Sequence, residues 1–169
     1  MRIKSFFKEL LKFFGIQVRR IPSNFNLYEK NEDEILQVLI KNEGAIVLDV
    51  GANKGQSITR FQKILKKPVI FSFEPLPSQF DELKKFENEY IKTFNIALGK
   101  KIEKKKFYVN IKDDTSSFLK VNQNSSWLKS RAKAFNVNPD KFTSREIQVE
   151  INTVDNIIKQ NNLKKVDLI

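Results

Sequence analysis

The chain has 169 residues, of which 31 are Lys or Arg and 20 are Asp or Glu, so its formal net charge is +11. A chain of this length is typical of one domain. It has neither cysteine nor histidine, which excludes disulfides and leaves no thiolate or imidazole ligand for a metal. We therefore expect no metal site, and a general base would have to be Asp, Glu, Lys or Tyr.

The positive charge has two explanations. A large net charge favours anionic partners such as nucleic acid, lipid headgroups or acidic glycans. The chain is also rich in Lys, Asn, Ile and Phe, as the codon bias of an A/T-rich genome would make it, and we favour this explanation. We expect no nucleic-acid partner, because the sequence contains no aromatic–basic RNA-binding signature and no helix-turn-helix pattern. The basic run Lys100–Lys106 is typical of a solvated hairpin.

The first 26 residues are predicted to be separate from the domain that follows, residues 27–169. Residues 3–14 have apolar side chains at helical spacing and lysines on another face. Such a helix lies on a membrane surface, or it packs on the domain or on a second subunit. No stretch is apolar enough for a membrane span or a secretory signal. We therefore expect a cytoplasmic location, with peripheral membrane contact through residues 3–14 left open and no oligomeric state assigned.

The middle of the chain alternates predicted helices with short apolar strands. Asn31, with Glu34 three positions on, resembles a capping box, and Ile35, Leu36 and Leu39 would form the buried stripe of the helix it begins. Strands that alternate with helices of this length imply a parallel sheet with right-handed crossovers. In chain order we expect a helix over 31–41, a strand at Ile46–Val50, a helix over 55–66, a strand at Val69–Phe73, a helix over 77–88 and a strand at Ile91–Leu98.

The pattern changes after residue 106. Apolar residues alternate with polar ones over 107–111 and again over 147–151, which is typical of half-exposed antiparallel strands at a sheet edge. A helix is expected between them over 125–135, and Thr153 is expected to cap a last short helix. Val166–Ile169 begins like another buried strand. The predicted fold is therefore α/β, with a parallel sheet and an antiparallel β insertion.

The segment that follows the first strand carries the most chemical information. Asp49 ends the strand, and Gly51 and Gly55 flank a turn that leads into a helix. A helix N-terminus after such a turn binds carboxylates and phosphates. A phosphate-binding P-loop would need Gly-Lys-Ser/Thr, and a dinucleotide site Gly-x-Gly-x-x-Gly; neither is present. The remaining candidate ligand is S-adenosylmethionine, whose positive charges Asp49 could face and whose carboxylate the turn N–H groups could bind.

Glu74 ends the second strand, nineteen residues after Gly55. An acid in this place accepts hydrogen bonds from the hydroxyls of a ribose. Sites for nicotinamide dinucleotides use the same device, so Glu74 alone does not identify the ligand. Together with the Asp-x-Gly-x-x-x-Gly turn, it favours S-adenosylmethionine.

At four blocks the sequence resembles the FkbM-type methyltransferases. The Glu-Pro-x-Pro signature of the second block and the Asn-Ile-Ala-Leu-Gly of the third make the resemblance more specific than the glycine turn alone. The resemblance covers roughly residues 30–169. The blocks are Val47–Ser57, Phe71–Leu83, Asn95–Gly99 and Ile151–Ile169.

The resemblance implies a Rossmann-like class I methyltransferase sheet and O-methyl transfer from S-adenosylmethionine to a hydroxyl of a sugar, glycolipid or other secondary metabolite. The methionine part of the cofactor would lie among Asp49, Gly51, Asn53 and Gly55. Glu74 would hold the ribose, with Pro75 near the adenine and Asn95 and Ala97 on the adenine side. Ser116 and Ser117 would lie on the substrate side. No catalytic residue is assigned.

The sequence differs from the family pattern at its C-terminus. Family members continue after Asp-Leu-Ile into a Lys-Ile-Asp-x-Glu-Gly block, whereas this sequence stops at Ile169. We therefore expect a sheet that is incomplete at its C-terminus, in a fragment or a truncated gene product. Two alternatives to an active O-methyltransferase stay open: a non-catalytic remnant of such an enzyme, and a nucleic-acid-binding methyltransferase.

Overall fold

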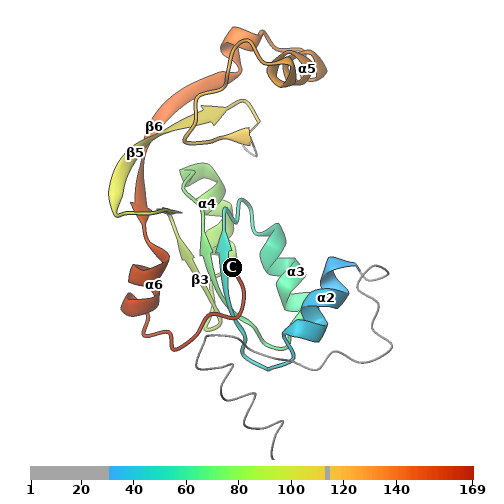
Figure 1. Cartoon of the computed structure of the whole chain (residues 1–169), viewed down its shortest axis with the longest axis vertical. Helices are drawn as coiled ribbons and strands as arrows, with labels where there is room; N and C mark the ends of the chain where they lie inside the picture. Colours follow the sequence, from blue (N-terminus) through green and yellow to red (C-terminus); the bar gives the residue numbers. More distant parts are fainter. Residues whose placement is uncertain (1–30, 113–114) are drawn as a thin grey trace, which may run out of the picture.

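The structure is a computed structural model that describes residues 31–112 and 115–169. The predicted helix over 3–14 and the boundary at residues 26–27 lie outside the described residues. The described chain is a mixed α/β fold with two small sheets (Figure 1). Its elements are α2 (Glu32–Leu39), β1 (Ile46–Val50), α3 (Gln56–Ile64), β2 (Val69–Phe73), α4 (Pro77–Leu83), η2 (Lys84–Phe86), β3 (Ile91–Phe94), β4 (Ala97–Leu98), β5 (Glu103–Asn110), α5 (Ser126–Ala134), η4 (Pro139–Lys141), β6 (Thr143–Asn152) and α6 (Val154–Gln160).

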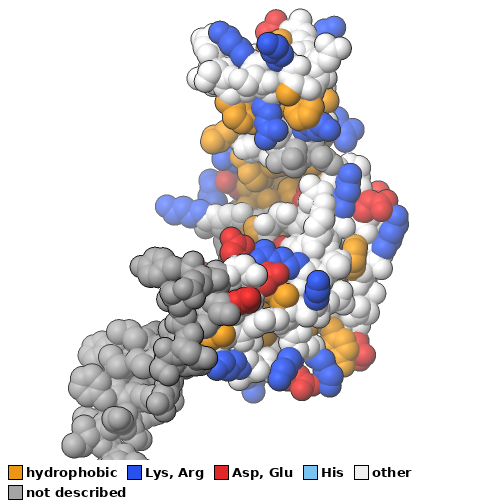
Figure 2. All heavy atoms as spheres, turned by 90° about the vertical axis from the view of Figure 1, so that its right-hand side faces the viewer, with side chains coloured by type: hydrophobic (Ala, Val, Ile, Leu, Met, Phe, Trp, Pro, Cys, Tyr) orange, Lys and Arg blue, Asp and Glu red, His pale blue; other side chains and the backbone are white. Residues whose placement is uncertain are grey.

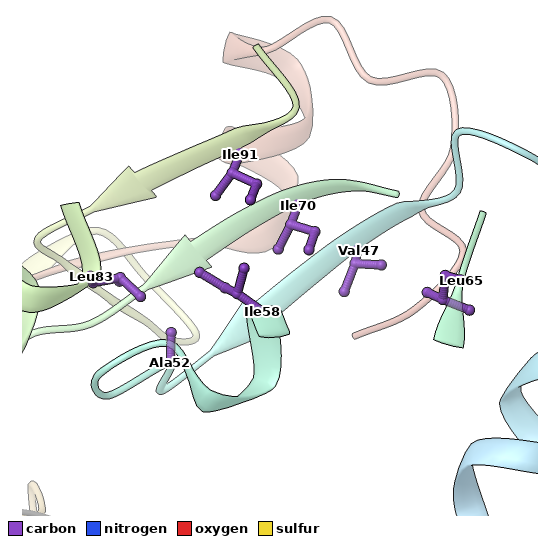
Figure 3. Packing of buried hydrophobic residues seen from close by; sticks show 7 residues of the cluster. All are labelled: Val47, Ala52, Ile58, Leu65, Ile70, Leu83 and Ile91. Carbon is purple, nitrogen blue, oxygen red and sulfur yellow. The ribbon is translucent and has the colours of Figure 1, made fainter. Parts of the chain in front are cut away.

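The first sheet is parallel, in the order β1-β2-β3. Val47, Ile70 and Ile91 stand side by side on one face and pack against residues of α3 and α4 (Figure 3). On the other face, Leu48 and Phe71 pack with Ile157 of α6. Both faces of the sheet are thus covered, which explains why its strands are short apolar runs.

The end of the chain lies beside β1. The N–H of Leu48 donates to the carbonyl of Leu168 (2.9 Å), and Val47 and Leu168 form a single parallel bridge. This contact is on the side of β1 away from β2, so the order across the sheet is β3, β2, β1, Leu168. The expected strand at Val166–Ile169 is present only as this one bridge.

The prediction of one strand over Ile91–Leu98 is wrong, because the segment forms two strands. β3 ends at Phe94, and after a bend at Asn95 and Ile96 the chain enters β4, which belongs to the second sheet. That sheet has the order β4-β6-β5. β4 runs parallel to β6, and β5 pairs antiparallel with β6 from Glu103↔Ile151 to Asn110↔Thr143. The alternating segments therefore form a separate sheet, and not an edge of the first one.

β5 and β6 extend as a long arm above the end of the first sheet where the glycine turn lies (Figure 1). Two lysines of the basic run at the start of the arm pair across the strands. Lys104 pairs with Glu150 and Lys106 with Glu146, at 2.9 and 2.7 Å. These two cross-strand pairs favour the antiparallel register.

The helices confirm the predicted caps but are shorter than predicted. The side chains of Asn31 and Thr153 accept from the N–H groups of Glu34 and Asn156. The predicted helix over 77–88 tightens into η2 and ends at Phe86. The predicted stripe on α2 is not buried, since Leu39 is 42% exposed and the helix has no buried residue. No helix within 31–112 or 115–169 has the length and apolar character needed to cross a bilayer.

Candidate functional site

The glycine turn after β1 follows a left-handed backbone path. Gly51 and Gly55 have φ values of 82° and 89°, and Asn53 has 49°. Glycine adopts this left-handed region without cost, and Asn tolerates it better than most residues. The N–H groups of Gly51 and Ala52 both donate to the carbonyl of Phe73, at 2.9 and 3.0 Å. The turn is thereby fixed to the end of β2.

Most of the turn's own N–H groups are therefore already used. Gly55 donates to the carbonyl of Ala52, and Asn53 donates to the carboxylate of Glu74, both at 2.9 Å. Gly55 is also the N-cap of α3, and it provides no side chain to cap that helix. Of the two sources of donors that the sequence suggested, the turn and the N-terminus of the helix after it, the first turn of α3 is therefore the main one.

Gly55 is needed for packing as well as for its backbone angle. A Cβ at this position would lie 2.6 Å from a ring carbon of Phe86. The ring of Phe86 in η2 therefore packs directly against the backbone of Gly55, at the start of α3. Around Gly51, by contrast, a Cβ would meet no atom within 4 Å. Gly51 is therefore required by its φ angle, and it leaves open space over the turn.

Glu74 connects the turn to the segment after β2. It is 5% exposed. Its Oε2 accepts from the N–H of Asn53 (2.9 Å), and its Oε1 accepts from the N–H of Leu76 (2.8 Å). Each oxygen thus has a backbone donor. The carboxylate is thereby fixed in position at the end of β2.

A cavity of about 270 Å³ opens beside Glu74. Four parts of the chain line it: the end of β1 with the turn, the segment after β2, β4, and the lower part of the arm. Its walls are mostly apolar, and Glu74 is the one titratable residue among those that line it. The lining residues are Val50, Gly51, Asn53, Phe73, Glu74, Pro75, Leu76, Ala97, Leu98, Phe107, Ser116 and Phe118.

The arm residues of this cavity were not all expected. Phe107 and Phe118 contact each other edge to face, with ring centres 4.8 Å apart, and Lys105 lies over the Phe118 ring. Ser116 lines the cavity, and its Oγ accepts from the N–H of Asn110. Ser117 does not line it, because its backbone pairs with Tyr108. Of the two adjacent serines, Ser116 thus lines the site, and the two phenylalanines form an aromatic wall.

Among the residues predicted for the adenine side, Pro75 and Ala97 line the cavity, and Asn95 does not. The side-chain amide of Asn95 donates to the backbone carbonyl of Glu74 at 2.8 Å. Asn95 therefore acts on the shape of the backbone next to the cavity. It stabilises the bend at which the chain leaves the first sheet for β4.

Asp49 lies on the other side of the β1 end. It lines a neighbouring cavity of about 400 Å³, formed between α2, α3 and β1, and Val50 borders both cavities. Its Oδ2 accepts from the hydroxyls of Ser57 (2.5 Å) and Ser72 (3.4 Å). Burial raises the pKa of Asp49 above its usual 3.8, and the two serine hydrogen bonds partly oppose that rise. Within the described residues, no three acidic side chains converge to form a metal site.

Comparison with known proteins gives one match. The family model described as "Methyltransferase FkbM domain" covers residues 49–169, which begin at Asp49 and include the turn, Glu74 and the arm. No curated protein and no solved structure matches the chain.

Proposed function

Because the chain belongs to the FkbM methyltransferase family and is thus a methyltransferase, we propose that it transfers a methyl group from S-adenosylmethionine to a hydroxyl of a small-molecule or glycan acceptor. The match confirms the predicted family. The observation that carries the cofactor assignment is the buried Glu74 carboxylate, which is fixed by Asn53 and Leu76 at the edge of a mostly apolar cavity.

The strand order supports a Rossmann-like sheet for this activity. The order β3, β2, β1 followed by Leu168 matches the first four positions of the 3-2-1-4 arrangement. In such sheets, ligands bind outside the carboxyl ends of the strands, where the strand order reverses. The reversal falls beside β1, where the glycine turn and both cavities lie.

The cavity beside Glu74 suits the adenosine part of the cofactor. Its walls of Phe73, Leu76 and Phe107 would remove the adenine ring from water. The Glu74 carboxylate would accept from the two ribose hydroxyls. An apolar wall with one anchored acid is the combination that a nucleoside needs, and it would not suit a phosphate, which the carboxylate would repel.

The methionine part would extend past Val50 and Gly51 toward Asp49. The open space over Gly51 allows a ligand to approach the backbone. The first turn of α3 carries the donors and the positive end of a helix dipole for the methionine carboxylate. Asp49, held by Ser57 and Ser72, would face the positively charged groups.

The bound cofactor supplies an electrophilic methyl group on a sulfonium. The residues of this chain contribute mainly position: Glu74 fixes the ribose, the aromatic wall fixes the adenine, and the glycine turn leaves room for the reacting groups. Holding two reactants in line accounts for a large part of such a rate enhancement. Glu74 already accepts two backbone hydrogen bonds, so we assign it to binding rather than to proton removal.

Isothermal titration calorimetry with S-adenosylmethionine, S-adenosylhomocysteine and NAD tests the cofactor. We expect the first two to bind and NAD not to bind. Gly51→Val and Glu74→Ala should abolish binding, because valine is strained at φ 82° and alanine removes the ribose acceptor. Unchanged affinity in both variants would refute the cofactor site. Transfer of a labelled methyl group to cell-envelope glycan extracts then tests the acceptor class.

A further inference from the structure

The far end of the arm, which we call the arm tip, consists of residues 111–112 and 115–145 and contains α5, η4 and the first three residues of β6. It has a small core of its own, in which Leu128, Ala132 and Phe142 are buried. In Figure 1, α5 lies at the end of the arm away from α2 and α3. The proposed cofactor site uses only its lower edge, through Ser116 and Phe118.

The arm tip is strongly basic, and within the described residues its cations lack the ion pairs that Lys104 and Lys106 of β5 form. By sequence it has seven basic and three acidic residues, with Asp113 and Asp114 included. Figure 2 shows Lys and Arg side chains gathered on this end of the molecule. No acidic side chain of the described residues forms an ion pair with any of the seven bases. The bases are Lys112, Lys120, Lys129, Arg131, Lys133, Lys141 and Arg145.

Two of these cations are held in place by aromatic rings. The guanidinium of Arg131 lies over Trp127 and over Phe135, at 6.0 and 5.9 Å from the ring centres. The ammonium of Lys112 lies 4.8 Å from the centre of the same Phe135 ring. Both cations thus lie at the Phe135 ring. A guanidinium fixed in this way also presents a pre-oriented fork of donors that matches a carboxylate.

From this geometry we propose that the arm tip binds carboxylate groups of the acceptor, and that the acceptor is an acidic glycan long enough to reach from Arg131 to the cavity beside Glu74. The proposal deepens the proposed function and rests on it. An extended chain is required because β5 contributes Phe107 to that cavity, whereas Lys112 follows the far end of β5 at Asn110 and Arg131 lies on α5, at the end of the arm in Figure 1.

Nucleic acid fits the same charge less well. Sequence-tolerant binding of single strands relies on aromatic faces on which bases stack. Trp127 already contacts Phe142 edge to face, at 5.7 Å between ring centres, and Arg131 covers it. Phe135 carries both cations. Trp127 is 44% exposed, but Arg131 lies over its ring, so the tip offers fixed positive charge rather than a row of free ring faces, which suits carboxylates on a sugar chain.

The test measures binding to three probes by the full chain: an oligogalacturonate hexamer, the neutral hexamer maltohexaose, and a single-stranded DNA hexamer. We expect the oligogalacturonate to bind at least about tenfold more tightly than maltohexaose, with an affinity that falls as salt is added. Lys112→Gln/Arg131→Gln should lower the oligogalacturonate affinity about tenfold, the equivalent of two lost charge-assisted contacts. The matched control Lys63→Gln/Lys159→Gln removes the same charge from α3 and α6 and should leave it unchanged.

Affinity for S-adenosylmethionine, measured on the same preparations, separates the two proposals, because the tip variant should bind cofactor normally. If the wild-type chain binds the glycan and not the cofactor, the proposed function fails and the anion site stands. If the tip variant does not fold, Lys129→Gln/Lys133→Gln, which changes two exposed lysines of α5, takes its place with the same expected loss. Equal affinity for the two hexasaccharides, or a loss as large in the control as in the tip variant, overturns the proposal. DNA binding that is as tight and equally sensitive to the tip substitutions overturns the glycan assignment.

Discussion

Replacing Glu74 with Gln tests whether this side chain braces the site as well as binding a ligand. In the structure both carboxylate oxygens accept backbone N–H groups, from Asn53 and from Leu76. A glutamine keeps one acceptor and turns an NH₂ group toward the other N–H. One charge-assisted hydrogen bond becomes a neutral one, and the second backbone donor is left facing a donor at a buried position.

These two losses can be estimated. A hydrogen bond to a charged group contributes about 1.5–3 kcal/mol and a neutral one about 1 kcal/mol, and a buried unsatisfied donor costs about 1–3 kcal/mol. Removing the buried charge offsets part of the loss, because its desolvation no longer has to be overcome. We expect the free energy of unfolding of Glu74→Gln to be about 2–3 kcal/mol lower than that of the wild type.

Urea denaturation followed by circular dichroism measures this difference, with no cofactor present. Glu82→Gln is the control, since Glu82 is exposed on α4 and pairs with Lys85 along the surface; such a pair contributes about 0.5 kcal/mol or less. Cofactor affinity of Glu74→Gln should fall together with stability. If its unfolding free energy equals that of the control variant while cofactor binding is lost, Glu74 is a ligand group alone and the bracing argument is wrong.

Three further substitutions follow from the same geometry. Phe118→Ala should weaken S-adenosylmethionine binding about tenfold, as expected for a lost aromatic wall, whereas Leu119→Ala, at a side chain that is 76% exposed, should not; calorimetry compares them. Gly55→Ala should lower the thermal midpoint, because its Cβ meets Phe86 at φ 89°, and adding Phe86→Leu should restore part of the loss. Burial raises the pKa of Asp49, so its ionisation costs stability as pH rises above about 4. Asp49→Asn should therefore gain stability relative to the wild type in urea titrations as the pH rises from about 4, and lose cofactor affinity.

The parts of the fold that depend on neighbouring residues were predictable from the sequence. β1 and β2 are runs of apolar residues buried on both faces, and their bounds were correct. The caps of α2 and α6 depend on a side chain that reaches an N–H three residues on, so Asn31 and Thr153 could be identified. The exposure of the α2 side chains could not be predicted, because whether Leu39 is covered depends on the tertiary structure.

The division of Ile91–Leu98 into β3 and β4 depends on contacts distant in sequence. Asn95 donates to the carbonyl of Glu74, 21 residues earlier. β4 pairs with β6, at Ala97↔Ile151. The local pattern of Ile, Phe, Ile and Leu continues across the bend, so periodicity indicated one strand. We predicted that Asn95 lies on the adenine side of the cofactor, whereas its side chain stabilises the bend.

The residues of the candidate site likewise fall into those that could be identified from the sequence and those that could not. Glu74, Pro75 and Ala97 could be identified from strand ends and from the family blocks, and each lines the cavity. Phe107 was predicted as a strand residue and Phe118 not at all. Their role in the cavity depends on how the arm folds back over the sheet. The apolar alternation that includes Phe107 was a signal for burial, and it contained no information about which surface would be buried.

The segment after β2 connects the two sheets, and this explains why its residues form one motif. The Glu74 carboxylate holds the N–H of Asn53 in the glycine turn and the N–H of Leu76. The Leu76 side chain is buried in the core of the second sheet, with Ala97, Phe107 and Ile151. One carboxylate therefore fixes the distance between the turn of the first sheet and the core that supports the arm. A change in the packing of the arm would reach the turn through this residue, so the aromatic wall and the ribose acceptor are positioned by the same contact.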